Sequence, residues 1–175
     1  MELYVIRHGI TNTNVLKQIN GVNEEDINQR GVRQANKAAL FFEKIDYDLV
    51  IASPLKRTVT TANIINIKEK EMIFDDRLKE RDSASMMYRD VSVVDIDSWY
   101  DMNLDIVGID SESFKSVVAR VYNFLNDLKN KYPEKALIIV THGDVCKAIR
   151  GITRGSFEGI AKFEQDNCEI MKYKI

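Results

Sequence analysis

The stretch LYVIRHG, residues 3–9, decides the fold, because an apolar run stops abruptly at a cation, an imidazole and a glycine. The same layout returns downstream as ALIIVTHG, residues 136–143, and the two stretches contain the only histidines of the chain, His8 and His142. Short apolar runs of this kind are typical of parallel strands covered on both faces. Ligands of open α/β sheets gather at the carboxyl ends of such strands. We therefore expect both imidazoles to face one crevice.

Strand-like and helical patterns alternate along the rest of the chain. This alternation predicts a single domain over residues 1–175, with a three-layer α/β/α fold and a mostly parallel central sheet. Residues 81–108 lack a clear pattern, and their scattered Met and aromatic side chains predict a cap-like insertion over the site. The expected helices run from 28 to 45, from 54 to 67, from Asp110 or Ser111 to 131 and over 145–151, and the expected strands cover 48–52, 71–75, 160–163 and 168–175.

The overall charge points to a local site and not to a large charged partner. The formal net charge is -2 and the pI is near 5.8, so we expect neither a nucleic acid nor a membrane partner. The longest apolar run is far shorter than the roughly 20 residues of a spanning helix. The first strand begins at once, which leaves no room for a signal peptide, and we expect a cytoplasmic protein.

Four blocks of sequence carry the residues that phosphoryl chemistry needs, namely donors for phosphoryl oxygens and a neutral nucleophilic nitrogen. The blocks are RHGIT at 7–11 with Asn14, SPLKRT at 53–58 with Thr61 and Ala62, LKE at 78–80, and THG at 141–143. In this order they resemble the motifs of the histidine phosphatase superfamily, which includes cofactor-dependent phosphoglycerate mutases. The resemblance covers nearly the whole chain and implies a phosphoglycerate mutase-like fold.

The resemblance implies that His8 is the nucleophile and becomes phosphohistidine, while Arg7, Arg57 and His142 hold the phosphoryl oxygens. A nucleophilic His8 must be neutral, with a lone pair on one ring nitrogen. Its other ring nitrogen carries the hydrogen and needs an acceptor, such as a local backbone carbonyl, to fix the tautomer. Arginine offers a fork of donors for phosphate, and a protonated His142 would add charge in the transition state. Glu80 is then expected to protonate the leaving alkoxide and to deprotonate the water, which suits a moderately raised pKa.

Further residues match family positions that touch phosphate or substrate. They are Thr11, Asn14, Asn20, Gly21 and Gly143. The side chains of Thr11 and Asn14 could equally cap the start of a helix.

The segment after the acid departs from the family pattern. Family members often have glycines and an aromatic residue there, whereas RDSASMM follows at 81–87. Asp82 is therefore an alternative to Glu80 as the acid. Substrate specificity is expected to lie in residues 81–108, together with Lys17.

The predicted function is hydrolysis of a small organic phosphomonoester, with no metal and no cofactor. One alternative is a phosphoglycerate mutase-type phosphoryl transfer, although such enzymes usually carry longer insertions and a C-terminal tail. Another is a non-catalytic phosphate-binding module, which would have no need of Glu80. The sequence leaves the physiological substrate and the oligomeric state undefined.

Two rival chemistries are disfavoured by spacing. Asp95 and Asp97 follow an apolar run, as in metal-dependent haloacid dehalogenase-type phosphatases, but Trp99 stands where that family has Thr or Val. We interpret these aspartates as the start of a short helix. Cys146 and Arg150 are too close together for the Cys-x5-Arg loop of tyrosine phosphatases, and a buried thiol explains Cys146. No HExxH pattern accompanies the histidines, so we predict no metal site.

Overall fold

A computed structural model describes residues 1–104 and 110–175 of the chain. Its core is a five-stranded sheet in the order β3-β2-β4-β1-β5. Pairing is parallel throughout except at the edge strand β5, which runs antiparallel to β1. The strands are β1 (Glu2–Arg7), β2 (Leu49–Ala52), β3 (Met72–Phe74), β4 (Ala136–Thr141) and β5 (Ile170–Lys174).

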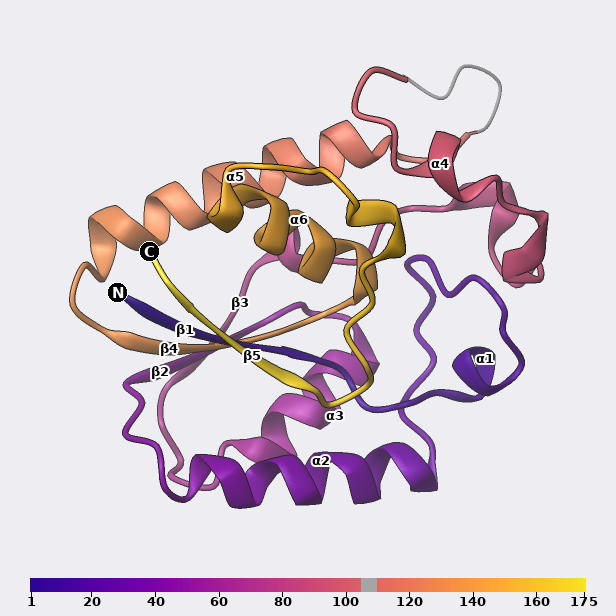
Figure 1. Cartoon of the computed structure of the whole chain (residues 1–175). Coiled ribbons are helices and arrows are strands. Elements are labelled where there is room, and N and C mark those ends of the chain that lie inside the picture. The colour runs from indigo at the N-terminus through magenta and orange to yellow at the C-terminus, as the bar shows by residue number, and fades with distance from the viewer. Residues whose placement is uncertain (105–109) are drawn as a thin grey trace.

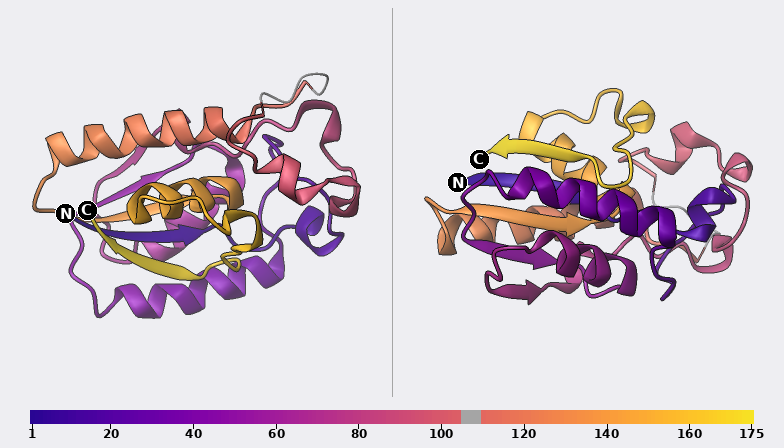
Figure 2. Two further views of the ribbon diagram at one scale, coloured as in Figure 1. Left: turned by 45° about the horizontal axis from the view of Figure 1, so that its top comes forward. Right: turned by 90° about the horizontal axis from the view of Figure 1, so that it is seen from below.

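Helices cover both faces of this sheet (Figures 1 and 2). The helices α2 (Gln29–Phe42) and α3 (Lys56–Ile65) lie on one face, and α5 (Phe114–Lys131) and α6 (Gly143–Arg154) lie on the other. Each face has its own cluster of buried apolar side chains, because β-strand residues alternate between the two faces. The predicted three-layer α/β/α fold with a mostly parallel sheet is confirmed.

The strand register brings the two histidine motifs together. Arg7 in β1 is paired with Thr141 in β4, so His8 and His142 follow side by side at the carboxyl edge of the sheet. Strand β2 pairs with β4 on its other side and leads into Ser53 at the same edge. Parallel strands therefore deliver three of the predicted blocks to one place.

Two expectations about local structure are wrong. Helix α5 is capped by Ser113 and not by Asp110 or Ser111, because the Ser113 side chain accepts a hydrogen bond from the Ser116 N–H at 3.2 Å. The strand expected over 160–163 is instead a 3-10 turn, Ile160–Lys162. Its carbonyl groups turn toward the Lys147 ammonium, which binds the carbonyls of Ile160 and Ala161 at 3.1 Å each, so they are diverted from a strand ladder.

Residues 81–104, which we call the cap segment, are built from short turns. They contain two 3-10 turns (Ala84–Met86 and Val91–Val93) and the short helix α4 (Ile96–Trp99), which confirms the helix start predicted at Asp95. Three backbone hydrogen bonds join this segment to residues 17–19, next to helix α1 (Asn12–Val15). The remainder of the predicted insertion, up to Gly108, lies outside the described residues. The 3-10 turn Asp76–Leu78 leads into the segment from β3.

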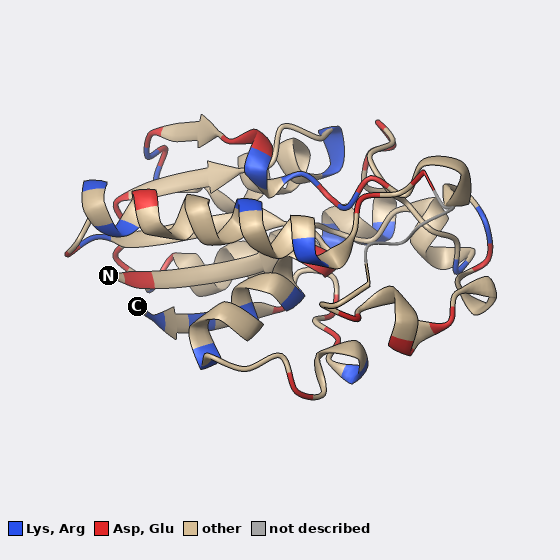
Figure 3. Cartoon of the chain, turned by 90° about the horizontal axis from the view of Figure 1, so that it is seen from above, with Lys and Arg blue, Asp and Glu red and all other residues tan. Residues whose placement is uncertain are grey.

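Charges of both signs are spread along the ribbon (Figure 3). Within residues 1–104 and 110–175, none of the helices combines the length and the apolar composition that crossing a membrane requires.

Candidate active site

His8 is held in one neutral tautomer directly after β1. Its Nδ1 lies 2.8 Å from the Gly9 carbonyl oxygen, and its backbone N–H donates to the Thr141 carbonyl at 2.9 Å. Burial, assisted by the charges of Arg57 and Arg7, lowers the pKa of His8 well below its ordinary value. A neutral ring that donates Nδ1–H to a carbonyl keeps the lone pair on Nε2. This is the form that a nucleophilic imidazole requires.

The glycine of the first motif is explained by packing. A Cβ atom on Gly9 would lie 2.8 Å from the Gly31 carbonyl oxygen, which is closer than real Cβ contacts allow. The Gly9 N–H donates to the Thr61 hydroxyl at 3.0 Å, and that hydroxyl donates to the Arg57 carbonyl at 2.7 Å. The helix that carries Arg57 is thereby fixed to the loop that carries His8.

His142 lies against His8, with ring centroids 5.2 Å apart. The Arg57 Nε–H donates to His142 Nδ1 at 3.2 Å, and His142 Nε2 lies 2.8 Å from the Ser53 hydroxyl oxygen. Burial, followed by the charge of Arg57, lowers the pKa of His142 well below its ordinary value. Because Nδ1 is an acceptor, the ring is neutral and donates from Nε2. The expectation of a protonated His142 is therefore wrong in this arrangement.

Arg57 is fully buried and orders the loop opposite the histidines. Its Nη1 donates to the Asn23 carbonyl and its Nη2 to the Gly21 carbonyl, each at 2.7 Å. Gly21 adopts a left-handed backbone with φ of 54°, which favours glycine. The Asn23 amide donates to the Asn20 carbonyl at 2.8 Å. Asn20 and Gly21, both predicted to touch substrate, thus lie on a loop that Arg57 positions.

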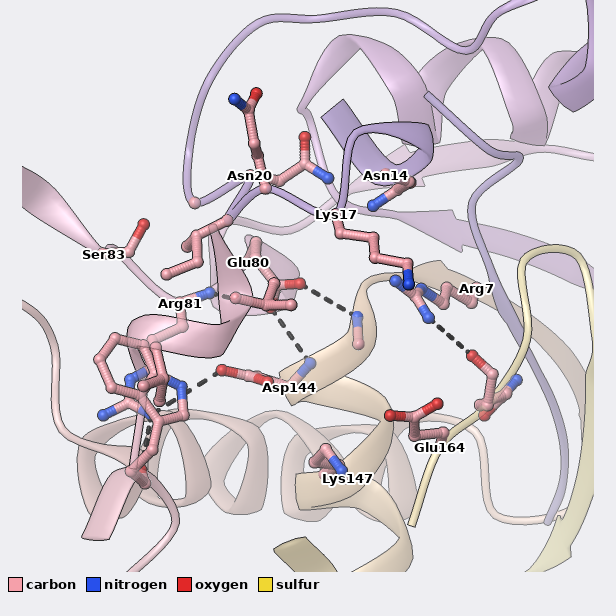
Figure 4. Close-up of a pocket in the computed structure, with 18 of the residues that line it drawn as sticks. Arg7, Asn14, Lys17, Asn20, Glu80, Arg81, Ser83, Asp144, Lys147 and Glu164 are labelled. Atoms are coloured by element: carbon pink, nitrogen blue, oxygen red, sulfur yellow. Dashed lines mark hydrogen bonds and ion pairs between the residues drawn. The ribbon is translucent and has the colours of Figure 1, made fainter. Parts of the chain in front are cut away.

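Thr11 and Asn14 cap helix α1. The Asn14 N–H donates to the Thr11 hydroxyl, and the Thr11 N–H donates to the Asn14 amide oxygen, both at 3.2 Å. Thr11 is buried and its role is that of a cap. The Asn14 side chain lies close to Lys17 and Arg7 in Figure 4. Of the two alternatives, capping explains Thr11, whereas Asn14 serves as a cap and also lines the cavity described below.

Glu80 occupies the N-terminus of helix α6. One carboxylate oxygen accepts the Gly143 N–H at 3.0 Å, and the other accepts the N–H groups of Asp144 at 3.2 Å and Arg81 at 3.0 Å. Helix N-termini favour negative charge, which explains the placement of a carboxylate here. The Gly143 N–H, predicted to touch phosphate, is engaged by Glu80 in this arrangement.

The surroundings of Glu80 also make it a usable acid at neutral pH. Burial, followed by the nearby Asp144 carboxylate, raises the pKa of Glu80 to about 7, while the guanidinium groups of Arg57 and Arg7 act in the opposite direction. A carboxyl group with a pKa near the working pH can both give and take a proton. Asp82, the alternative acid, is exposed and accepts the Ala84 N–H at 2.9 Å, which leaves Glu80 as the better candidate.

A cavity of about 710 Å³ opens above this edge of the sheet (Figure 4). Arg7, Asn14, Asn20, Gly21, Glu80 and Gly143 line it among the predicted residues. His8, Arg57 and His142 are buried and are not part of its lining. Thr11 is likewise buried away from it.

Sequence reasoning placed the aromatic residues of the cap segment in a cap over the site but missed the contacts that join them to Arg81 and to α6. The Tyr100 hydroxyl donates to the Asp144 carboxylate at 2.7 Å, and the Arg81 guanidinium lies 4.0 Å from the centre of the Trp99 ring. Arg81 also donates to the Trp99 carbonyl at 2.8 Å. Lys147 lies with its ammonium 4.7 Å from the centre of the Tyr100 ring. The high density of aromatic residues near 99–100 was the one available signal.

The aspartates of the rival metal-dependent scheme do not face this site. Asp95 and Asp97 are exposed, and Asp95 accepts the Ser98 hydroxyl at 2.5 Å at the start of α4. Among the residues that the structure describes, no group of three or more His, Cys, Asp or Glu side chains is arranged to hold a metal ion. Cys146 is buried, as expected.

Comparison with known proteins identifies the class. The profile of the histidine phosphatase superfamily (branch 1) matches residues 3–175, and the chain belongs to this family. The family and the phosphoglycerate mutase-like fold predicted from the motifs are thereby confirmed.

Individual relatives carry both phosphatase and mutase-like names. The chain is 30% identical to a metal-independent phosphoserine phosphatase of Arabidopsis thaliana, with 90% of this chain and 71% of the relative covered. It is 26% identical to phosphoglycerate mutase-like protein 4 of the same organism, covering 98% and 79%. The crystal structure of a phosphoserine phosphatase from Entamoeba histolytica in complex with 3-phosphoglyceric acid has a TM-score of 0.85 and 25% identity, covering 98% and 89%.

Proposed function

We propose that the protein is a phosphatase that hydrolyses a small organic phosphomonoester through a phosphohistidine on His8. The observation that carries the proposal is the neutral His8 ring, whose Nδ1 is fixed on the Gly9 carbonyl 2.8 Å away. Family membership and phosphatase-named relatives support the reaction class.

In the first step the His8 Nε2 lone pair attacks phosphorus while the bond from phosphorus to the ester oxygen breaks. The Nδ1–H keeps its carbonyl partner, which stabilises the positive charge that develops on the ring. Arg7 supplies a charged fork of donors at the cavity wall. Arg57, which is buried, acts through its charge and through the loop whose Gly21 and Asn23 carbonyls it binds.

Glu80 acts as the general acid in the first step and as the general base in the second. As a carboxylic acid it protonates the leaving alkoxide, and as a carboxylate it takes a proton from the water that attacks phosphohistidine. The phosphorus–nitrogen bond then breaks, His8 regains its lone pair and inorganic phosphate leaves. A pKa raised to about 7 supports both roles near neutral pH.

His142 contributes as a neutral donor in this scheme. Its Nδ1 is held by the Arg57 Nε–H and its Nε2–H by the Ser53 hydroxyl, which fixes the ring beside His8, where the phosphoryl group is transferred. The proposal needs neither a metal nor another cofactor, because every proton and electron pair is accounted for by these side chains.

A phosphoglycerate mutase-type transfer is the second candidate, since a mutase-like relative covers 98% of the chain. It would use the same phosphohistidine but return the phosphoryl group to a substrate hydroxyl in place of water. A non-catalytic phosphate-binding module is the third, and the raised pKa of Glu80 argues against it, because binding alone needs no proton donor.

The test is phosphate release from p-nitrophenyl phosphate and from a panel of sugar phosphates, with EDTA present. Release that His8→Ala abolishes supports the proposal, and release that survives this substitution contradicts it. Interconversion of 2- and 3-phosphoglycerate that exceeds phosphate release would favour the mutase. Loss of activity with EDTA would revive a metal-dependent scheme, and binding without turnover would indicate the module.

Three further predictions accompany this function. The chain forms one catalytic domain whose residues 81–108 cap the site. Its partner is a small phosphorylated substrate and neither a nucleic acid nor a membrane. Its location is cytoplasmic, which imaging of a tagged protein in its host would test.

A further inference from the structure

The cavity has two chemically different ends. Arg7, Asn14 and Glu80 mark the end at the sheet, where the phosphoryl group reacts in the proposed function. The cap segment forms the other end, which is lined by Val91, Val94, Ile96 and Trp99 among others. Pockets of roughly 300–1,000 Å³ enclose drug-sized ligands, so a phosphate alone would fill only a fraction of the 710 Å³ available.

The cap end offers apolar surface to a ligand. Val91 and Ile96 line the cavity and remain 48% and 47% exposed. Ile19, whose backbone pairs with Tyr88 and Arg89 of the cap segment, also lines the cavity. An apolar group that covers these half-exposed aliphatic side chains removes them from water and so stabilises the complex. This wall therefore favours a substrate with an apolar organic part.

The cations at the cap end are already occupied. Arg81 donates to the carbonyls of Glu112 and Trp99, at 2.5 Å and 2.8 Å, and lies 3.9 Å from the Asp144 carboxylate. Lys147 donates to the carbonyls of the turn at 160–162. Neither cation has its charge directed to a ligand in this arrangement.

Two polar atoms without partners do not alter this conclusion. Arg81 Nη2 and Ser83 Oγ form no hydrogen bond within the part of the chain that the structure describes, yet each exposes less than 1 Å². Both residues line the cavity, but neither of these two atoms offers an exposed donor or acceptor to a ligand in this arrangement. The acidic side chains of Asp144 and Glu164, which also line the cavity, would repel a substrate carboxylate.

Lys17 belongs to the phosphate end. Its side chain extends beside Arg7 in Figure 4, where its charge favours the phosphoryl group. It therefore contributes to the binding of every phosphomonoester and does not select among their organic parts.

We propose that the preferred substrate is a phosphomonoester whose organic part is apolar and carries no carboxylate, with that part lying against Val91 and Ile96. The proposal rests on the phosphatase function above. It concerns the rank order of substrates, whereas the function concerns the reaction itself.

The test compares phosphate esters of primary alcohols, so that leaving groups are of one kind. The enzyme is assayed with 3-phenylpropyl phosphate, n-propyl phosphate, O-phosphoserine and 3-phosphoglycerate. We expect kcat/KM to be highest for 3-phenylpropyl phosphate, by roughly tenfold or more over n-propyl phosphate, because a buried ring is worth more than 1.4 kcal/mol. A higher kcat/KM for O-phosphoserine or 3-phosphoglycerate than for 3-phenylpropyl phosphate would overturn the proposal.

Matched variants locate the effect. Val91→Ser is expected to lower kcat/KM for 3-phenylpropyl phosphate by roughly threefold to tenfold while n-propyl phosphate is unaffected, as lost apolar contact predicts. Val93→Ser is the control, because Val93 lies in the same 3-10 turn, is 55% exposed and does not line the cavity. Lys17→Gln should lower kcat/KM for both alkyl phosphates alike. Equal responses of the two valine variants would contradict the assignment.

The two levels of failure are distinguishable. If His8→Ala abolishes hydrolysis but a carboxylate substrate is preferred, the substrate class is wrong and the phosphatase function stands. If hydrolysis of all four esters is absent or survives His8→Ala, the function itself fails and the substrate inference fails with it.

Discussion

The buried centre at the sheet edge and the cap segment that faces it are held together in different ways. In the centre, the register of β1 against β4 places His8 beside His142. In the cap segment, side chains hold short turns: Asp90 accepts the Ser92 N–H at 2.8 Å, and Arg81 donates to the Trp99 carbonyl. A sheet register changes only as a whole, whereas a turn held by single side chains can change one residue at a time.

This difference suggests a division of work between the two regions. The centre supplies chemistry that is common to all phosphomonoesters, and the cap segment supplies the selection among them. Substitutions in the centre should therefore lower activity on every substrate in proportion. Substitutions in the cap segment should change the rank order of substrates.

The largest effect is expected for Arg57→Ala. The substitution leaves the carbonyls of Gly21 and Asn23 and the His142 ring without their donor. We expect kcat/KM to fall on the order of 10³-fold for every substrate and the free energy of unfolding to fall by about 3 kcal/mol. Lys56→Ala, an exposed neighbour on α3, is the control and should change neither. If Arg57→Ala changed the rank order of substrates, it would contradict the proposed division of work between the buried centre and the cap segment.

Glu80→Gln should have the next largest effect. Loss of the proton donor is expected to lower kcat/KM for alkyl phosphates by about 10²–10⁴-fold. Because the pKa of Glu80 is raised to about 7, the acid form is present below that pH and lost above it. The wild-type rate should therefore fall as pH rises through about 7, and the variant should lack this decline. Asp82→Asn, at the exposed neighbouring position, should retain the wild-type profile.

The raised pKa of Glu80 also makes the stability of the fold depend on pH. The folded pKa lies above the unfolded value of 4.5, so the folded state holds a proton that the unfolded state has lost between these pH values. Stability should decrease as pH rises from 4.5 to about 7, and Glu80→Gln should reduce that dependence. Urea unfolding at a series of pH values gives the free energy of unfolding of the wild type and of the Glu80→Gln variant. An unchanged pH dependence in the variant would contradict the raised pKa.

Asp144→Asn should give the smallest and most specific effect. It removes the like charge that raises the pKa of Glu80, while the amide oxygen can still accept the Tyr100 hydroxyl. We expect the alkaline decline of kcat/KM to move to lower pH, with a change of only a few-fold at its maximum. Asp97→Asn, which alters an exposed carboxylate on α4, should leave the profile in place. A shift to higher pH would be inconsistent with this role.

The regular elements were predictable from the sequence, because apolar periodicity records which face of an element is buried. The helix capped by Asn28 and the strand ending at Ala52 follow this pattern, as do the strands that lead to the histidines. The grouping of His8, Arg57 and His142 was also expected, since each follows a strand of one sheet.

What the sequence did not predict depends on single contacts between distant residues. The neutral state of His142 is set by the direction of the Arg57 Nε–H, which no periodicity records. The contact of Tyr100 with Asp144 joins the cap segment to α6 through one hydroxyl. The strand expected near 160 is a turn because Lys147 binds its carbonyls. Such contacts are specified by packing and not by local pattern.

The most direct test of the account is to trap the phosphoryl group on His8. Enzyme mixed with excess 3-phenylpropyl phosphate is quenched in alkali within one turnover, digested and analysed by mass spectrometry. We predict one added phosphoryl group on the peptide that contains His8, labile to acid and absent from the His8→Ala chain. A phosphoryl group on another residue, or full turnover by the His8→Ala chain, would contradict the central claim.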